Sequence, residues 1–135
     1  MKFLVSVLTI ALFVCIVNAN YQLMIPPFLM GAPESTVQEL QELIKRNINK
    51  PDFEVEALVE QWANEKGGTI KEKFYQFKAD MKLMQERANS MRKAMAQNLS
   101  PEARKADEDL SRIGNNKTLN VQQKQRKLAA YLAGN

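Results

Sequence analysis

An uninterrupted apolar repeat between residues 69 and 95 constrains the fold of this chain more than any other feature. Apolar residues recur in it at alternating steps of four and three, which is the spacing of one face of an α-helix. Thr69 and Glu72 fit a capping box at its start, and no Gly or Pro follows before Pro101. The apolar positions are Ile70, Phe74, Phe77, Met81, Met84, Ala88, Met91 and Met95.

A helix of this length needs partners, because ordering about 25 residues costs on the order of 40 kcal/mol of conformational entropy. Burying the apolar side chains of the repeat contributes only about 10–20 kcal/mol. The sequence therefore predicts that other helices pack along the whole repeat and that this long helix is the centre of the fold.

The first 19 residues are typical of a secretory signal peptide. Lys2 supplies a positive start, residues 3–17 are almost wholly apolar, and Val17-Asn18-Ala19 offers a cleavage site. The alternative is a membrane anchor, but the apolar run is shorter than the roughly 20 residues that a span requires, and no basic stop-transfer cluster follows it. We expect residues 1–19 to be removed and the remaining chain to be extracellular, with no membrane span.

The residue types of the remaining chain exclude several kinds of active site. The only cysteine, Cys15, lies in the predicted signal peptide, and the chain has no histidine. Ser-His-Asp and Cys-His triads and ordinary zinc sites are thereby excluded. A carboxylate hydrolase remains an alternative, but only scattered acids support it. We therefore expect a protein that is not an enzyme and that depends on its core rather than on disulfides for stability.

The charged residues do not predict a nucleic-acid partner. Nineteen basic and 15 acidic residues are intermixed along the chain, with a formal net charge of +4. Lys124, Arg126 and Lys127 form a small basic cluster, but a nucleic-acid site needs a denser stripe. We interpret this cluster as a solvated helix face.

Residues 20–33 form a segment of a different kind. Its apolar run contains Pro26 and Pro27, which are incompatible with a helix interior. We predict an extended arm whose Ile25, Phe28 and Leu29 lie in a groove between helices, because an exposed run of this kind would be a liability. A frayed tail is the alternative.

Start and stop signals divide residues 34–135, a single predicted domain, into five helices. Hydroxyl and acidic or amide residues precede each apolar stripe, and Gly or Asn follows it. No strand pattern appears, so the fold class is an all-α five-helix bundle with an N-terminal arm and one long central helix. The predicted N-caps are Ser35 or Thr36, Asp52, Thr69, Ser100 and Asn120, the last with Gln123 in a capping box. The last helix is expected to bury Val121, Leu128, Tyr131 and Leu132.

Two N-glycosylation sequons follow the long helix. Asn116-Lys117-Thr118 lies in a predicted exposed loop of a secreted chain, so we expect glycosylation at Asn116. The other sequon begins at Asn98, but Pro101 and the capping role of Ser100 disfavour its use.

Several short stretches together carry a resemblance to a known family. They are Pro26-Pro27-Phe28-Leu29, Gly31-Ala32-Pro33, Trp62-Ala63, Gly68, Phe74, Phe77 and Leu99-Ser100-Pro101-Glu102-Ala103. This set resembles the SXP/RAL family of secreted nematode antigens, which includes fish-nematode allergens. The resemblance extends from about Ile25 to Leu132, and it implies a small secreted all-α protein with an EF-hand-like, calmodulin-like arrangement. It also implies a cation-binding domain and host immune factors such as antibodies as partners.

The residues themselves supply few ligands for a cation. An EF-hand loop takes side-chain oxygens at positions 1, 3, 5 and 12 around a Gly at position 6. With Gly68 at position 6, Glu65 is the only side-chain ligand, and the alternative loop around Leu119 begins at Arg112. Any Mg²⁺ or Ca²⁺ binding should be weak, with Glu65 and Glu72 as candidate ligands. The alternative, which we favour, is that Glu72 completes the helix cap and Glu65 is solvated.

Two functions are compatible with these features. The first is a non-enzymatic secreted antigen at the host–parasite interface, with at most weak cation binding. The second is a carrier of a small hydrophobic ligand such as a fatty acid, because the methionines of the long helix resemble the adaptable lining of a binding groove. Core filling is the plainer interpretation of the same methionines, Met81, Met84, Met91 and Met95.

Overall fold

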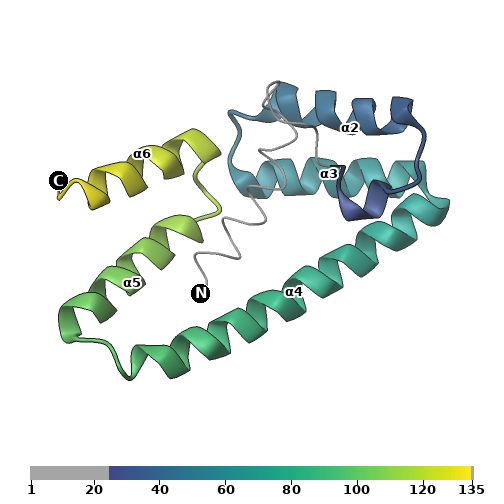
Figure 1. The fold of residues 1–135 in the computed structure, drawn as a ribbon. Helices are drawn as coiled ribbons and strands as arrows, with labels where there is room; N and C mark the ends of the chain where they lie inside the picture. The colour runs from purple at the N-terminus through teal and green to yellow at the C-terminus, as the bar shows by residue number, and fades with distance from the viewer. Residues whose placement is uncertain (1–24, 135) are drawn as a thin grey trace.

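The computed structural model describes residues 25–134, so the predicted signal peptide and residues 20–24 of the predicted arm lie outside the described residues. Within that range the chain forms one short 3-10 turn and five α-helices, with no strand (Figure 1). The all-α, five-helix prediction is confirmed. The elements are η1 (Pro27–Leu29), α2 (Glu34–Asn47), α3 (Asp52–Lys66), α4 (Gly68–Ala96), α5 (Pro101–Gly114) and α6 (Val121–Leu132).

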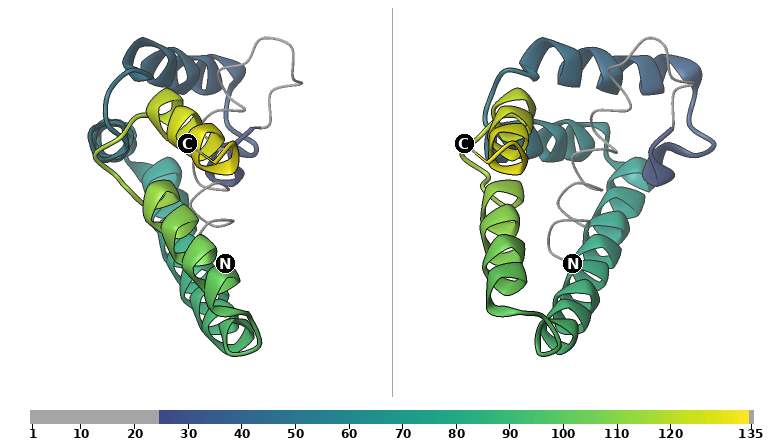
Figure 2. Two further views of the ribbon diagram at one scale, coloured as in Figure 1. Left: turned by 90° about the vertical axis from the view of Figure 1, so that its left-hand side faces the viewer. Right: turned by 60° about the vertical axis from the view of Figure 1, so that its left-hand side comes forward.

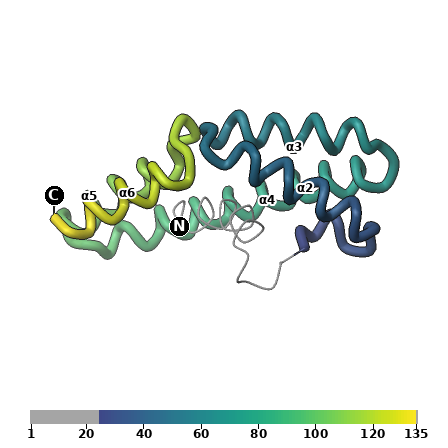
Figure 3. The backbone as a smooth tube through the Cα atoms, turned by 90° about the horizontal axis from the view of Figure 1, so that it is seen from above, coloured from purple at the N-terminus to yellow at the C-terminus, as the bar shows by residue number. Residues whose placement is uncertain are grey.

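The buried core lies at one end of the molecule, where η1, α2, α3 and the first turns of α4 meet. In Figures 1 and 3, α2 and α3 lie side by side, and α4 runs past them toward the opposite end. The predicted apolar stripe of α2 faces this core, since Val37, Leu40 and Ile44 are all buried. The full set of core residues is Phe28, Leu29, Val37, Leu40, Ile44, Val59, Trp62, Ala63 and Phe74.

The segment before α2 contributes two of these core side chains. Phe28 and Leu29 are only 2% and 1% exposed. The ring of Phe28 packs against the rings of Phe74 and Phe77, with centroid distances of 5.3 Å in both cases. The predicted burial of Phe28 and Leu29 is confirmed, although residues 27–29 form a 3-10 turn rather than an extended strand. The predicted burial of Ile25 is wrong, because this residue precedes the turn and is 46% exposed.

Helix α4 is the long helix that the sequence predicts, with 29 residues and no interruption. The prediction that its whole apolar repeat is covered is wrong. Helices α2 and α3 have 14 and 15 residues, so at 1.5 Å of rise per residue they reach along only about half of α4. Phe74 is buried, Ile70 and Phe77 pack at the edge of the core, and Met84, Met91 and Met95 are exposed.

Helices α5 and α6 fold back from the far end of α4 toward α2 and α3 (Figure 2). Arg92 connects α4 to α5, because its Nη1 donates to Asp107 Oδ2 at 2.8 Å and to Ser111 Oγ at 2.9 Å. Among the described residues, none from α5 or α6 belongs to the buried apolar core. The attachment of these two helices therefore depends strongly on polar contacts.

Two of the predicted helix caps are confirmed. Ser100 Oγ accepts a hydrogen bond from the backbone N–H of Ala103 at 3.2 Å and caps α5. Asn120 and Gln123 form the predicted capping box of α6, with bonds of 2.8 and 2.9 Å. In both caps the side chain and the backbone N–H that it binds lie three residues apart.

The other predicted caps are wrong, and the reason lies in the residues before them. Helices α2 and α3 begin directly after Pro33 and Pro51, and neither has a side-chain cap. Helix α4 begins at Gly68 after Gly67, whose φ of 64° turns the chain without a loop. Thr69 therefore lies inside the first turn, where it forms no capping box with a partner three residues on.

Candidate functional site

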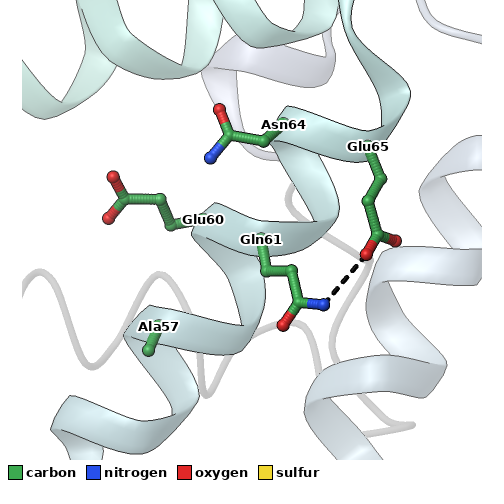
Figure 4. Close-up of a pocket in the computed structure, with 5 residues that line it drawn as sticks. All are labelled: Ala57, Glu60, Gln61, Asn64 and Glu65. Atoms are coloured by element: carbon green, nitrogen blue, oxygen red, sulfur yellow. Dashed lines mark hydrogen bonds between the residues drawn. The ribbon is translucent and has the colours of Figure 1, made fainter.

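The two candidate cation ligands lie on different helices on either side of the turn at Gly67. Glu65 is near the end of α3 and Glu72 is near the start of α4, and both side chains are exposed. Glu65 Oε1 accepts a hydrogen bond from Gln61 Nε2 at 2.9 Å (Figure 4). Because Gly67 alone separates α3 from α4, residues 63–74 are almost wholly helical and do not form an EF-hand loop.

A shallow hollow of about 490 Å³ lies beside Glu65 on α3 (Figure 4). Its second carboxylate, Glu60, is already paired, because Lys78 Nζ donates to Glu60 Oε2 at 2.7 Å. The hydroxyl of Tyr75 lies 3.1 Å from Glu60 Oε1 and 3.0 Å from Asn64 Oδ1. Two hydrogen bonds lower the pKa of Glu60 below its usual value, and the bond from Lys78 has a larger effect than the bond from Tyr75. A cation in this hollow would have to compete with the Lys78 ammonium group.

Two acidic residues of α5, Asp107 and Asp109, are likewise paired with basic groups. Asp107 binds Arg92, and Asp109 Oδ2 accepts from Lys105 Nζ at 2.7 Å and from the Tyr131 hydroxyl at 3.2 Å. The hydrogen bond from Lys105 is the main cause that lowers the pKa of Asp109. The carboxylates of Asp107 and Asp109 are therefore partly buried and held in ion pairs.

Polar contacts join the loop before α6 to the loop before α3, and we call this set the polar latch. Two backbone bonds align the loops: the N–H of Asp52 donates to Leu119 O and that of Phe53 to Lys117 O, both at 3.2 Å. Side chains extend the latch, because Asn120 Nδ2 donates to Asn49 O at 3.0 Å and Lys117 Nζ to Glu56 Oε2 at 2.9 Å. The central contact is the ion pair between Lys124 and Asp52.

The ion pair of the polar latch is buried. The side chains of Lys124 and Asp52 are 5% and 12% exposed. Burial raises the pKa of Asp52 above its usual value, and the hydrogen bond from Lys124 opposes this effect. Sequence reasoning missed Lys124, which it placed on a solvated face. The signal was present, because Lys124 lies three residues after Val121 and four before Leu128, on the stripe that α6 turns inward.

An exposed methionine face lies on the far half of α4, and we define it as Met84, Met91 and Met95. Steps of seven and four residues place these side chains on one face of the helix. They are 51%, 65% and 58% exposed, so they are not core filling. Their neighbour Arg92 forms the hydrogen bond to Asp107 of α5. Leu132 of α6, which was predicted to be buried, is also exposed, because it is the last residue of its helix.

The predicted glycosylation site lies on the surface. Asn116 is exposed in the loop between α5 and α6. Its Oδ1 accepts hydrogen bonds from the backbone N–H of Thr118 at 3.0 Å and from the Thr118 hydroxyl at 2.6 Å. The sequon therefore forms a local turn that solvent can reach.

No helix within residues 25–134 combines the length and the apolar character that a membrane span requires. In the same residues, no three side chains of the types His, Cys, Asp and Glu gather closely enough to hold a metal ion.

Comparisons with known proteins identify relatives of this chain. The family model described as "SXP/RAL-2 family protein Ani s 5-like, metal-binding domain" matches residues 1–134. The chain is 42% identical to the SXP/RAL-2 family protein Ani s 5 of Anisakis simplex over 106 residues, which are 78% of this chain and 69% of that protein. It is 35% identical to the OV-17 antigen of Onchocerca volvulus over 108 residues, which are 80% of this chain and 66% of that protein. No solved structure matches.

The described residues do not fit the metal centre that the description of the family model suggests. The two candidate ligands are exposed and lie on separate helices, and the nearby Glu60 is held by Lys78 and Tyr75. The helical stretch across Gly67 also supplies no loop of backbone carbonyls, which a calcium site normally uses. The match of the family model over nearly the whole chain, together with the two relatives, shows that this chain belongs to the SXP/RAL-2 family.

Proposed function

We propose that this chain is a secreted, non-enzymatic antigen that acts at the host–parasite interface and is bound by host antibodies. The observation that carries the proposal is its identity of 35% to a protein named as an antigen, the OV-17 antigen of Onchocerca volvulus, over 108 residues. The signal-peptide pattern of residues 1–19 supports secretion. The absence of histidine from the chain and the pairing of Glu60, Asp107 and Asp109 with basic groups support a role without catalysis.

Secretion is tested on the source animal itself. Antibodies raised against the recombinant chain should detect it in the culture medium, with an N-terminus that begins after Ala19. Sera from infected hosts should bind the same band. Detection only in body extracts, with residues 1–19 still attached, would contradict the proposal.

We expect any cation binding to be weak, because the candidate ligands Glu65 and Glu72 are exposed on separate helices and form no closed site. Titration with Ca²⁺ and then Mg²⁺ is followed by the fluorescence of Trp62, which lies one turn before the end of α3. We expect a dissociation constant no tighter than about 10⁻⁴–10⁻³ M, with little discrimination between the ions. The double variant E65Q/E72Q should abolish this response, while E42Q on α2 should not. A tight, calcium-selective response would show that other residues bind the ion.

The exposed methionine face supports a second candidate function, a carrier of a small hydrophobic ligand such as a fatty acid. A flexible apolar surface of this kind adapts to varied ligands. If the chain is a carrier, a fluorescent fatty acid should bind with micromolar affinity, and the variant M84S/M91S/M95S should weaken binding at least tenfold. The variant M30S, which changes an exposed methionine outside α4, is the matched control. Absence of binding would exclude this function.

A further inference from the structure

The thioether groups of the methionine face are chemically reactive, and the position of this face exposes them to solvent. Its three thioethers are more than half exposed, whereas Met81 on the same helix is partly buried. None of the three belongs to the buried core, which ends at Phe74 on α4. Their sulfur atoms are therefore open to small reagents in solution.

Within residues 25–134, the composition of the chain makes exposed methionine sulfur atoms the most oxidisable surface groups, and besides these three only Met30 is more than half exposed. The only cysteine is Cys15, which precedes the described residues, and the chain has no histidine. The only tryptophan, Trp62, is in the core and 6% exposed. A hydroperoxide that reaches residues 25–134 therefore meets methionine thioethers as the most reactive groups on the surface.

We propose that Met84, Met91 and Met95 form an oxidation site that takes up hydrogen peroxide or a related hydroperoxide without loss of the fold. A lone pair of each thioether sulfur attacks one peroxide oxygen, the O–O bond breaks and an S–O bond forms. The sulfur is oxidised by two electrons to the sulfoxide, and the leaving hydroxide or alkoxide takes the proton of the new S–OH group, so that hydrogen peroxide is reduced to water and an organic hydroperoxide to its alcohol. Each methionine thus consumes one equivalent of oxidant.

The position of the methionine face explains why the fold should survive this reaction. Oxidation of a buried methionine places a polar sulfoxide in the core and disrupts packing. Here the sulfoxide oxygen faces water, since each side chain is more than half exposed. Oxidation therefore converts an apolar surface into a polar one while the contacts of the core remain. The inference does not depend on the antigen role proposed above.

The test is a time course of oxidation in the purified chain, because trypsin separates the relevant methionines. Cleavage after Lys and Arg places Met81, Met84, Met91 and Met95 on four different peptides, residues 79–82, 83–87, 88–92 and 94–104. The protein is treated with excess hydrogen peroxide in buffer and, separately, in urea. In buffer, the three residues of the methionine face should react within about threefold of their rates in urea, and Met81 should react at least fivefold more slowly than in urea.

Three results would overturn the proposed oxidation site. Protection of Met84, Met91 and Met95 by tenfold or more in buffer would show that the face is covered in solution. A fully oxidised protein that loses its cooperative thermal transition would show that the methionines support the core. The variant M84L/M91L/M95L should consume three fewer equivalents of peroxide, whereas M81L should lose one equivalent from the slow phase only. Unchanged consumption by the triple variant would also refute the assignment.

Discussion

At the scale of single residues, Lys124 offers the sharpest test of how the molecule holds together. The variant K124M removes the cation and leaves the carboxylate of Asp52 buried without its partner. Breaking a buried ion pair in this way costs about 3–5 kcal/mol at neutral pH. We expect urea denaturation at pH 7 to show a loss of about 3 kcal/mol. The variant K127M, which changes an exposed lysine of the same helix, should be within about 0.5 kcal/mol of the unchanged chain.

The pH dependence of K124M identifies the cause of that loss. Burial already raises the pKa of Asp52 above 3.8 in the folded chain, and removing Lys124 raises this pKa further. The folded state of the variant then binds a proton more tightly than the unfolded state, so its stability falls as pH rises above 3.8. Stability lost at pH 7 should return as the pH is lowered toward that value. The double variant D52N/K124M should recover most of it at pH 7, and a loss that is equal at all pH values would contradict this account.

Asn116 provides a second test at the residue scale. Because the residue is exposed in a local turn, we expect a glycan there when the chain is produced in a eukaryotic secretory pathway. The variant N116Q should lose the mass of one glycan, and digestion with a peptide-N-glycosidase should abolish the difference. The variant N98Q should leave the mass of the glycan unchanged, because Ser100 caps α5 and Pro101 follows. A mass that is unaffected by N116Q would show that the site is not used.

At the scale of elements, the 3-10 turn η1 packs between α4 and the rest of the core. Phe28 is 2% exposed and contacts two aromatic rings of α4. The variant F28A should lower the free energy of unfolding by about 3–5 kcal/mol, as Phe-to-Ala changes in cores do. Chemical denaturation of F28A and of the control I25A measures this effect. Equal stability of the two variants would show that η1 does not hold the core.

The elements also show what could be predicted from local sequence. The caps at Ser100 and Asn120 depend on a few adjacent residues, and the structure has them where the sequence places them. The exposure of Met84 could not be predicted in this way. An apolar repeat states which face of a helix is apolar, but the length of the neighbouring helices decides how much of that face is covered.

The candidate site could likewise be predicted only where its features depend on local sequence, and not where they depend on the tertiary fold. That Glu65 and Glu72 are too few for an EF-hand loop stays a prediction. The close succession of α3 and α4, with only Gly67 between them, depends on a positive φ at that residue, which the sequence signals only weakly. Lys124 could have been placed from its position on the stripe of α6. Its partner Asp52 lies 72 residues away, so their pairing required the tertiary fold.

At the scale of the whole molecule, the two ends should differ in local stability. The apolar core involves η1, α2, α3 and the start of α4, whereas α5 and α6 attach through the polar latch and Arg92. Amide hydrogen exchange should therefore be at least tenfold slower in the middle of α2 and α3 than in α5 and α6. In K124M the exchange of α6 should accelerate further. Uniform protection across all helices would mean that the molecule unfolds only as one unit.

The unbroken length of α4 has a consequence for how an immune system would meet this molecule. Twenty-nine residues at a rise of about 1.5 Å give a rod of roughly 43 Å between the core and the turn before α5. An antibody covers about 800 Å² of its antigen, a patch roughly 30 Å across. If host antibodies bind this chain as proposed, its two ends lie far enough apart for two of them to bind one molecule together. A single monomer would then suffice to bring two receptor-bound antibodies side by side.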